Sequence, residues 1–487
     1  IGSDEDDPGG FKVTIFNTTT FRRSEVVYFD IELPQKIAHK GMTLMDENGH
    51  EMPFQMIGSH ASDVFVDHIW EVPSILSTGK HRFYALIGQI PAHGYKTLKV
   101  KLHDVSLRNY GSLVTADNTI ENELLKLTVN PDGSFNLLDK NGNKNYQNLG
   151  YFTDEGEAGS AWQHIPLVYD RKFTSKGGNA IISITEEGPL QASLSVEFFM
   201  NLPESYVDAE SRSNNLKKVP FKVTYTLKKS SHLVYIDVEV DNNVKDHWLR
   251  YNFDTGLKTK KSLADTHFDY VERDIHIPDS TGWVEEAQGT HPLQSFVTIN
   301  DGENGIAVFT KGLFEYQAHE NSQGTLAITL LRACRIKLKV SEEKITELPD
   351  EGIQCPGIHR FKMAVMPYQG NPYKAGLGRI SASFNQPLRV ISSGSSVTNG
   401  LPRQYEGIHL QNDEVQITSI KPSESGEGVI LRFFNPHNEQ VRVDMKVPYK
   451  EAFRCKLTEE ITETLNIEKG TLSLDAGAKK IITLKFI

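Results

Sequence analysis

Cysteine, long apolar runs and basic charge are all scarce in this sequence. Three cysteines in 487 residues, Cys334, Cys355 and Cys455, argue against a disulfide framework and favour reduced thiols in the cytoplasm. No apolar run is long enough to cross a bilayer, so no membrane partner is expected. The 52 basic and 63 acidic residues give a net charge of −11. Because phosphate backbones repel an acidic protein, nucleic acid is not expected as a partner.

Amphipathic helical patterns are also nearly absent, and the dominant period along the chain is two. Val13 and Ile15 alternate with polar neighbours, and residues 234–240 do the same over a longer run. Such alternation is typical of half-buried strands. One short helix is expected after Asn371. The sequence therefore predicts an all-β fold built of β-sandwich domains.

Turn residues separate the expected strands. Residues 125–129 alternate, Pro131 to Gly133 turn the chain, and Asn141-Gly142 supply a second turn after the next apolar run. The polar stretch Pro203 to Lys218 is typical of an exposed excursion between strands. So many strands in one block predict large stacked antiparallel sheets.

The length is that of about three domains. The acidic, glycine-rich residues 1–10 are interpreted as a linker or an expression remnant. Residues 11–104 are expected to form a small β-sandwich, residues 105–385 a large β supersandwich, and residues 386–487 a C-terminal small β-sandwich. The serine-rich stretch 392–396 is interpreted as the crossover into the last of these.

One loop has the composition of a sugar-binding site. Asp154, Glu155 and Glu157 alternate with glycines shortly before Trp162. Glycine lets a backbone approach a ligand, carboxylates accept from sugar hydroxyls, and an indole face can stack on a pyranose ring. In the alternative interpretation the acidic residues cap a turn and Trp162 belongs to the core.

Other polar groups are weaker candidates. His267 and Asp269 lie on one face of an expected strand, but zinc needs about three protein ligands and no nearby cluster supplies the rest. The cluster around Arg273 either binds sugar hydroxyls or forms a solvated strand end. No nucleophile elbow and no phosphate-binding glycine loop occurs, so no catalytic residue is assigned.

The order and spacing of these segments resembles the C-terminal β portion of glycoside hydrolase family 38, the α-mannosidases, and especially its bacterial branch. The resemblance covers nearly the whole chain from Phe11. The residues that carry it are Glu123, Leu124 and Leu127 with Asp132-Gly133; Leu138 to Lys140; Asp154 to Trp162 with Pro166; Asp246, His247, Leu249 and Arg250; Phe268 and Arg273; Phe314 to Tyr316; Thr329 to Arg332; and Arg432 to Asn435.

The resemblance implies a retaining, exo-acting α-mannosidase that requires zinc. In that family the metal ligands, nucleophile and acid/base lie in an N-terminal catalytic domain, whose motifs have no counterpart here. Zinc is therefore expected in the full-length enzyme and no metal is expected on this chain, which is expected to be inactive alone. The resemblance also implies that the large central domain is a supersandwich of the galactose-mutarotase type.

By the same resemblance, the β domains wall one side of the substrate cleft. Trp162 corresponds to the family's aromatic, often a tyrosine, and Arg332, or else Arg335, to its arginine; Glu157 and Arg273 complete the expected substrate-binding set. The expected partners are an α-mannoside or glycan and the protein's own N-terminal catalytic domain, with a homo-oligomer left open. The alternative is a stand-alone carbohydrate-binding or structural β protein, and a lyase or epimerase on the same sandwich is a third.

Overall fold

The structure is a computed structural model that describes residues 10–67, 72–108, 110–208, 210–336, 338–341, 344–346, 351–394, 401–412 and 414–487. Strands dominate these residues, and every paired strand is antiparallel to its neighbour. The fold is all-β, as predicted. Among the residues described, no helix has the length and apolar character needed to span a membrane. Residues 1–9 of the expected leader lie outside the described ranges.

The first sandwich packs a five-stranded sheet against a three-stranded one. Its core holds the apolar residues of the predicted period-two strands, including Val13 and Ile15. The first sheet contains β3 (Gly41–Met45), β6 (Gly94–His103), β1 (Lys12–Asn17) and β30 (Arg389–Ser393), with β31 (Gln404–Tyr405) beside β6. The second contains β2 (Arg23–Pro34), β5 (Ser74–Ile90) and β4 (Phe54–Val66).

The large central sandwich stacks a ten-stranded sheet on a nine-stranded one, with a single apolar core between them. The ten-stranded sheet runs β22 (Thr290–Pro292), β25 (Glu315–Ala318), β26 (Thr325–Ala333), β19 (His247–Asp254), β11 (Lys144–Gly156), β10 (Phe135–Asp139), β9 (Leu125–Val129), β8 (Thr119–Glu121) and β7 (Val114–Ala116), with β12 (Phe173–Thr174) on β11. The nine-stranded sheet runs β13 (Ile181–Glu186), β14 (Gln191–Pro203), β17 (Leu216–Lys228), β18 (Val234–Asn242), β29 (Gly357–Gln369), β24 (Asn304–Lys311), β23 (Phe296–Asn300), β20 (Lys261–Thr266) and β21 (Asp269–Asp274).

The third sandwich is smaller and has its own apolar core. One of its sheets contains β32 (His409–Leu410), β35 (Val441–Lys446), β39 (Thr471–Ala476) and β38 (Ile467–Glu468). The other contains β33 (Gln416–Pro422), β34 (Val429–Phe434), β40 (Ile481–Phe486), β36 (Ala452–Cys455) and β37 (Ile461–Leu465).

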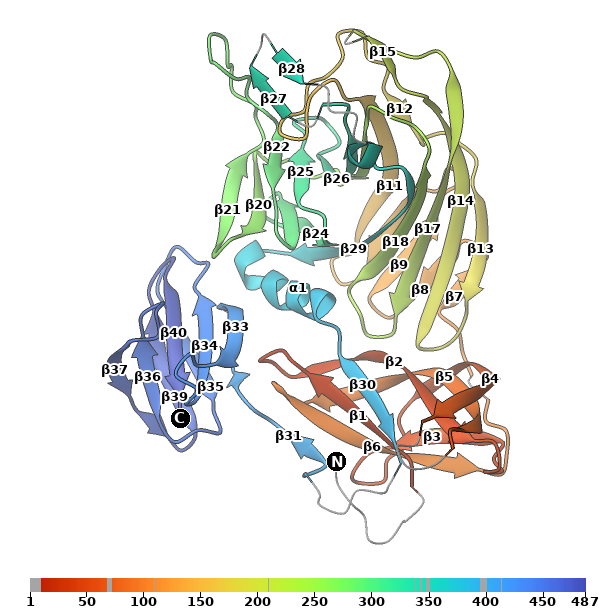
Figure 1. Ribbon diagram of the computed structural model, residues 1–487, viewed down its shortest axis with the longest axis vertical. Coiled ribbons are helices and arrows are strands. Elements are labelled where there is room, and N and C mark those ends of the chain that lie inside the picture. Colours follow the sequence, from red (N-terminus) through yellow and green to blue (C-terminus); the bar gives the residue numbers. More distant parts are fainter. Residues whose placement is uncertain are drawn as a thin grey trace.

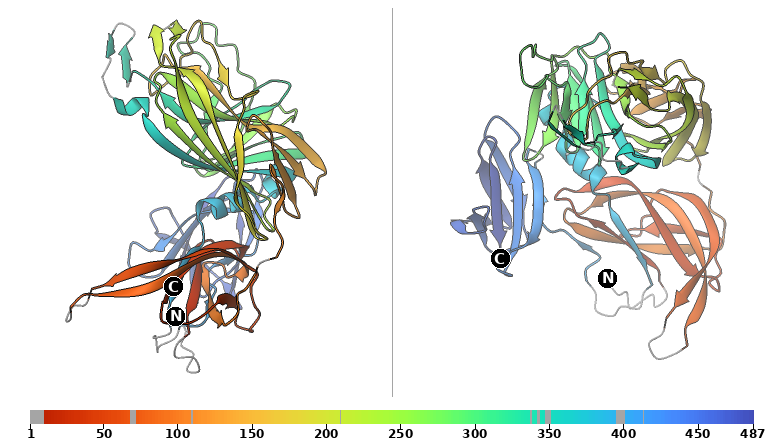
Figure 2. Two further views of the ribbon diagram at one scale, coloured as in Figure 1. Left: turned by 90° about the vertical axis from the view of Figure 1, so that its right-hand side faces the viewer. Right: turned by 45° about the horizontal axis from the view of Figure 1, so that its top comes forward.

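Short elements connect these bodies. They are the hairpins β15 (Tyr206–Asp208) with β16 (Ser211–Arg212) and β27 (Leu338–Ser341) with β28 (Lys344–Thr346), the 3₁₀ turns Glu351–Gln354 and Pro372–Lys374, and the helix α1 (Leu377–Asn385). In Figure 1 α1 lies below the large sandwich, above the first sandwich and beside the third, and both views in Figure 2 keep it among the three bodies.

The predicted hairpin from residue 125 onward is confirmed, with one difference in its second turn. Gly133 has the expected positive φ of 86°, but at the second turn it is Asn143 that adopts positive φ, at 49°, and not Gly142. Gly142 is needed for space instead, because a Cβ there would lie 2.1 Å from Nε2 of Gln369.

Two boundary expectations need correction. The stretch 203–218 is not simply exposed, because it folds into the β15–β16 hairpin and buries Arg212. The third sandwich does not begin at residue 386, because β30 pairs with β1 from Lys12↔Ser393 to Phe16↔Arg389 and so completes the first sheet. The open edge of β1 needs a partner, and the chain supplies it on its way to the last sandwich. Residues 395–400, the end of the expected crossover, lie outside the described ranges.

Candidate functional site

Strand β19 is buried on both faces, which is unusual for an antiparallel sheet with one core. Leu249, Tyr251 and Phe253 point into the apolar core. Trp248 and Arg250 point to the opposite face, yet they are only 3% and 2% exposed. The covering layer includes residues 157–176, which contain β12, and here the ring of His164 lies 4.2 Å from the ring of Trp248. The sheet thus holds a polar layer between itself and a long loop.

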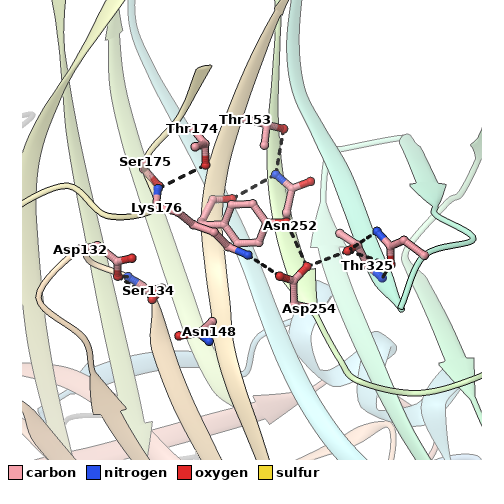
Figure 3. Close-up of polar contacts among 12 residues, drawn as sticks. Asp132, Ser134, Asn148, Thr153, Thr174, Ser175, Lys176, Asn252, Asp254 and Thr325 are labelled. Carbon is pink, nitrogen blue, oxygen red and sulfur yellow. Dashed lines mark hydrogen bonds and ion pairs between the residues drawn. The ribbon is translucent and has the colours of Figure 1, made fainter. Parts of the chain in front are cut away.

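One end of this loop is clamped by an aspartate at the end of β19 (Figure 3). Asp254 Oδ1 accepts from the hydroxyl of Tyr151 at 3.0 Å and from Oγ1 of Thr325 at 2.7 Å. Its second oxygen forms an ion pair with Lys176, whose ammonium nitrogen lies 3.8 Å from the centre of the Tyr151 ring. The carboxylate and the aromatic face both stabilise the half-buried ammonium of Lys176, which fixes this end of the loop on the sheet.

The first acid of the predicted sugar loop, Asp154, is buried and fully hydrogen-bonded within the protein. Asp154 is fully buried, and its two oxygens accept from Nη2 of Arg212 and Nδ1 of His247, each at 2.5 Å. The other ring nitrogen of His247 lies 3.2 Å from Oδ1 of Asn242. These contacts tie the β15–β16 hairpin to β11 and β19.

The second acid, Glu155, faces the covered side of the sheet. Its Oε1 accepts from Nη2 of Arg250 and from Nζ of Lys172, each at 2.5 Å. Burial raises the pKa of Glu155, but the charge of Arg250 and the bond from Lys172 outweigh it, so the pKa lies below its ordinary value. Arg250 also stacks on Trp248, 3.9 Å from the ring centre to Cζ. The outer face of β19 is therefore rigid.

The third acid, Glu157, holds the loop itself. It is fully buried, and Oε1 accepts from the backbone amides of Gly159 at 2.7 Å and Ile165 at 3.2 Å. Its Oε2 accepts from Nδ1 of His164 at 2.7 Å and Nε of Arg332 at 3.0 Å. Burial opposes the charged form, but the His164 bond and the two positive charges lower the pKa of Glu157 below its ordinary value. Its carboxylate thus folds the loop around one buried point.

Two models of one known protein family match this chain. The family model "Glycosyl hydrolases family 38 C-terminal domain" matches residues 120–337, and "Glycosyl hydrolases family 38 C-terminal beta sandwich domain" matches residues 414–484. The chain belongs to glycosyl hydrolase family 38. Its matched parts are the C-terminal domains of that family, as the resemblance predicted.

Individual relatives agree with this assignment. The chain is 26% identical, over 387 residues and 76% of its length, to a curated protein of Halalkalibacterium halodurans named "Putative mannosylglycerate hydrolase", of which it spans only 41%. It shares the fold of two solved Enterococcus faecalis proteins, an alpha-mannosidase (TM-score 0.85, 19% identity) and a family 38 protein (TM-score 0.83, 20% identity). Both alignments cover 98% of this chain, but 56% and 58% of those chains.

In this family 38 chain, the loop anchored by Glu157 presents Trp162 to solvent. Trp162 is 83% exposed, which rules out the alternative that it belongs to the core. It follows a tight turn in which its amide donates to Oγ of Ser160 at 3.2 Å. Nη2 of Arg332 donates to the carbonyl of the same Ser160 at 2.9 Å. Arg332, which was named separately from the sequence and lies on β26, therefore binds the loop that contains Glu157 and Trp162.

The roles of these residues differ from one another. Glu157 has both oxygens occupied and no exposed surface, which favours a positioning role over the direct sugar contact expected from the sequence. Arg332 uses Nε and Nη2 internally, and no described residue hydrogen-bonds to its Nη1. Arg335 instead pairs with Asp246 at 2.7 Å and covers the ring of Tyr206 at 3.9 Å. Of the two arginines, Arg332 is the one bound to the Trp162 loop.

The remaining candidates lie elsewhere. Arg273 is on β21 at the edge of the other sheet, where Nη1 donates to the Tyr316 hydroxyl at 3.4 Å, and it lines a separate cavity of about 560 Å³. His267 lies in the β20–β21 turn and Asp269 begins β21, so the expectation that both lie on one face of a strand is wrong. Asp269 forms an ion pair with Lys479 at 2.5 Å. Among the described residues no group of three or more His, Cys, Asp or Glu side chains is placed to hold a metal ion. Zinc therefore does not fit the residues described.

Sequence reasoning did not assign the internal partners of the three acids. Arg212 pairs with Asp154, Arg250 with Glu155, and His164 with Glu157, but Arg250 was named only as part of the family resemblance and Arg212 was not named at all. Arg212 lies 58 residues from Asp154 and in a stretch that the sequence assigned to solvent. Only His164, two residues after Trp162, carried a local signal, namely a histidine beside an aromatic in a glycine-rich loop.

Proposed function

We propose that this chain is the β portion of a retaining, zinc-dependent α-mannosidase, in which it forms one wall of the substrate cleft. The observation that carries the proposal is the loop fixed by buried Glu157, which holds an exposed Trp162 beside Arg332. An exposed aromatic face and a guanidinium with one nitrogen that has no described partner suit a pyranoside, because the indole can stack on the sugar ring and the sugar hydroxyls can accept from the guanidinium.

The chemistry is assigned to an N-terminal catalytic domain that is not in this chain. In the proposed enzyme, zinc and the reacting carboxyl groups reside there, and the metal would polarise sugar oxygens as a Lewis acid. The residues of this chain orient the sugar and exclude water from one side. Free Cys334, Cys355 and Cys455 support a reducing, cytoplasmic location.

The H. halodurans relative suggests a substrate class. A mannosylglycerate-like substrate would carry a carboxylate, and Arg332 has a nitrogen without a described partner to receive it. The enzyme would then prefer a mannoside bearing a carboxylate over methyl α-mannoside. A stand-alone carbohydrate-binding protein is the second candidate, supported by the same exposed tryptophan.

The test compares this chain alone with the enzyme that also contains the catalytic domain. The chain alone should not hydrolyse a chromogenic α-mannoside, whereas the complete enzyme should, with activity lost on chelation. In the complete enzyme Trp162→Ala should lower kcat/KM by about threefold to tenfold, because a lost aromatic contact is worth about 0.5–1.5 kcal/mol. Thermal unfolding should be unchanged, since Trp162 is 83% exposed.

Trp283→Ala is the matched control, because Trp283 is also exposed, at 60%, but lies between β21 and β22. Equal kinetics for Trp162→Ala and Trp283→Ala would contradict the assigned wall. Hydrolysis of the α-mannoside by this chain alone would overturn the assignment of the chemistry to a separate catalytic domain.

A further inference from the structure

A cavity of about 490 Å³ lies where three parts of the chain meet. It is lined by the β20–β21 turn, by α1 and by β33 of the third sandwich, which lie together in Figure 1. Its volume falls in the range of about 300–1,000 Å³ typical of small-ligand sites. None of its lining residues belongs to the Glu157 loop.

Two phenylalanines that line the cavity are exposed to solvent. Phe268 is 44% exposed and Phe314 is 62% exposed. Phe268 also adopts φ 61° in the β20–β21 turn, a conformation in which glycine or asparagine is favoured. An aromatic residue kept in that conformation costs stability, and such residues cluster where a side chain must meet a ligand.

A buried carboxyl group is the second feature. Asp265 is 8% exposed and lines the same cavity. Its Oδ2 accepts a hydrogen bond from Ser295, whose hydroxyl in turn accepts from Ser381 on α1 at 2.7 Å. No described residue donates to Oδ1. Burial raises the pKa of Asp265 to about 6. Near neutral pH the carboxyl group can therefore accept a hydrogen bond from a hydroxyl when ionised, or donate one when protonated.

Amide side chains complete the polar lining. Gln294 and Gln386 both line the cavity, and within the described ranges neither side-chain amide has a hydrogen-bond partner. Each presents a donor and an acceptor. The lining thus holds neutral amides, aromatic faces, one carboxyl and His267, with no described lysine or arginine. This set disfavours an anion and is more polar than an apolar ligand needs.

We propose that this cavity is a carbohydrate-binding site for one pyranose ring, separate from the cleft wall at Trp162. Phe314 and Phe268 offer stacking faces, Asp265 Oδ1 accepts from one ring hydroxyl, and Gln294 and Gln386 pair with others. Sugars require this combination, because each ring has apolar C–H faces and a rim of hydroxyls. The inference goes beyond the proposed function and does not depend on it.

Saturation-transfer NMR on this chain tests the site with methyl α-mannopyranoside, methyl β-glucopyranoside and methyl β-galactopyranoside as probes. At least one should receive saturation on its ring protons. Phe314→Ala and Gln294→Ala, both at exposed side chains, should each weaken its binding about threefold to tenfold. Phe199→Ala is the matched control, because Phe199 is 64% exposed on distant β14.

Arg332→Ala separates the two sites. Binding that survives Arg332→Ala and Phe199→Ala but falls in Phe314→Ala and Gln294→Ala supports the cavity. Binding lost in Arg332→Ala and kept in Phe314→Ala overturns this site while leaving the cleft wall intact. No transfer to any of the three pyranosides overturns it as well.

Discussion

Replacing Glu157 by glutamine should release the loop that carries Trp162. The glutamine oxygen can still accept from the amides of Gly159 and Ile165, but its NH₂ group then faces Nε of Arg332, which can only donate. A neutral His164 can accept from the NH₂ group at Nδ1, so the conflict is with Arg332. Two donors in contact repel, and the guanidinium loses its buried anion.

The magnitude follows from the burial of the partners. Breaking a buried ion pair costs about 3–5 kcal/mol. The side chains of Arg332 and His164 are 15% and 11% exposed, so water recovers part of that loss and about 2–3 kcal/mol is expected for local opening. Hydrogen exchange of the Gly159 and Ile165 amides should therefore accelerate about 30- to 160-fold, measured by mass spectrometry on the loop peptide.

Two further variants test the cause. Glu197→Gln breaks an ion pair with Lys222 whose side chains are 53% and 47% exposed, so loop exchange should not change. Adding Arg332→Met to Glu157→Gln should recover part of the protection, because no guanidinium is left unpaired. Exchange in Glu157→Gln within about threefold of the parent would refute the anchoring role of this carboxylate.

Two other predictions concern pH and packing. Because the folded-state pKa of Glu157 lies below its ordinary value of 4.5, its stabilisation is present above that pH and disappears as pH falls through the folded value. Protection of the Gly159 and Ile165 amides, relative to their intrinsic exchange rates, should therefore fall in acid in the parent and not in Glu157→Gln. Gly150→Ala should destabilise the large sandwich by about 3 kcal/mol or more, since φ is 75° and the new Cβ would lie 2.4 Å from the Tyr251 hydroxyl. Gly177→Ala, with φ 73° and nothing within 4 Å, should cost only about 1 kcal/mol in urea unfolding.

Part of the candidate site was predictable because its signal is local. Glycines, acids and a tryptophan within nine residues, Asp154 to Trp162, predict a ligand-binding loop. The structure exposes Trp162 on this loop. The alternative interpretation, in which the acids stabilise a turn, agrees with the bonds that Glu157 accepts from the Gly159 and Ile165 amides. The arginines that pair with the three acids lie 58 to 175 residues away in the sequence. No period or spacing connects such partners, and only packing does.

The cavity at Asp265 shows the same division. The strand expected there was placed at His267 and Asp269, whereas Asp265 lies on β20 and its neighbours come from α1 and from a different sandwich. The β30–β1 pairing likewise joins the chain near residue 390 to its beginning, against the boundary expected from the sequence.

The sequence by itself determined the strands and most turns, because alternation of apolar and polar residues selects a two-sided ribbon wherever it occurs. It also determined the family, through the order of its segments. Only the tertiary structure decided which carboxylates are buried and paired within the protein and which aromatic side chains are exposed to solvent. Burial and long-range pairing set those outcomes, because a charged group leaves water only when folding brings it an opposite charge or a hydrogen bond.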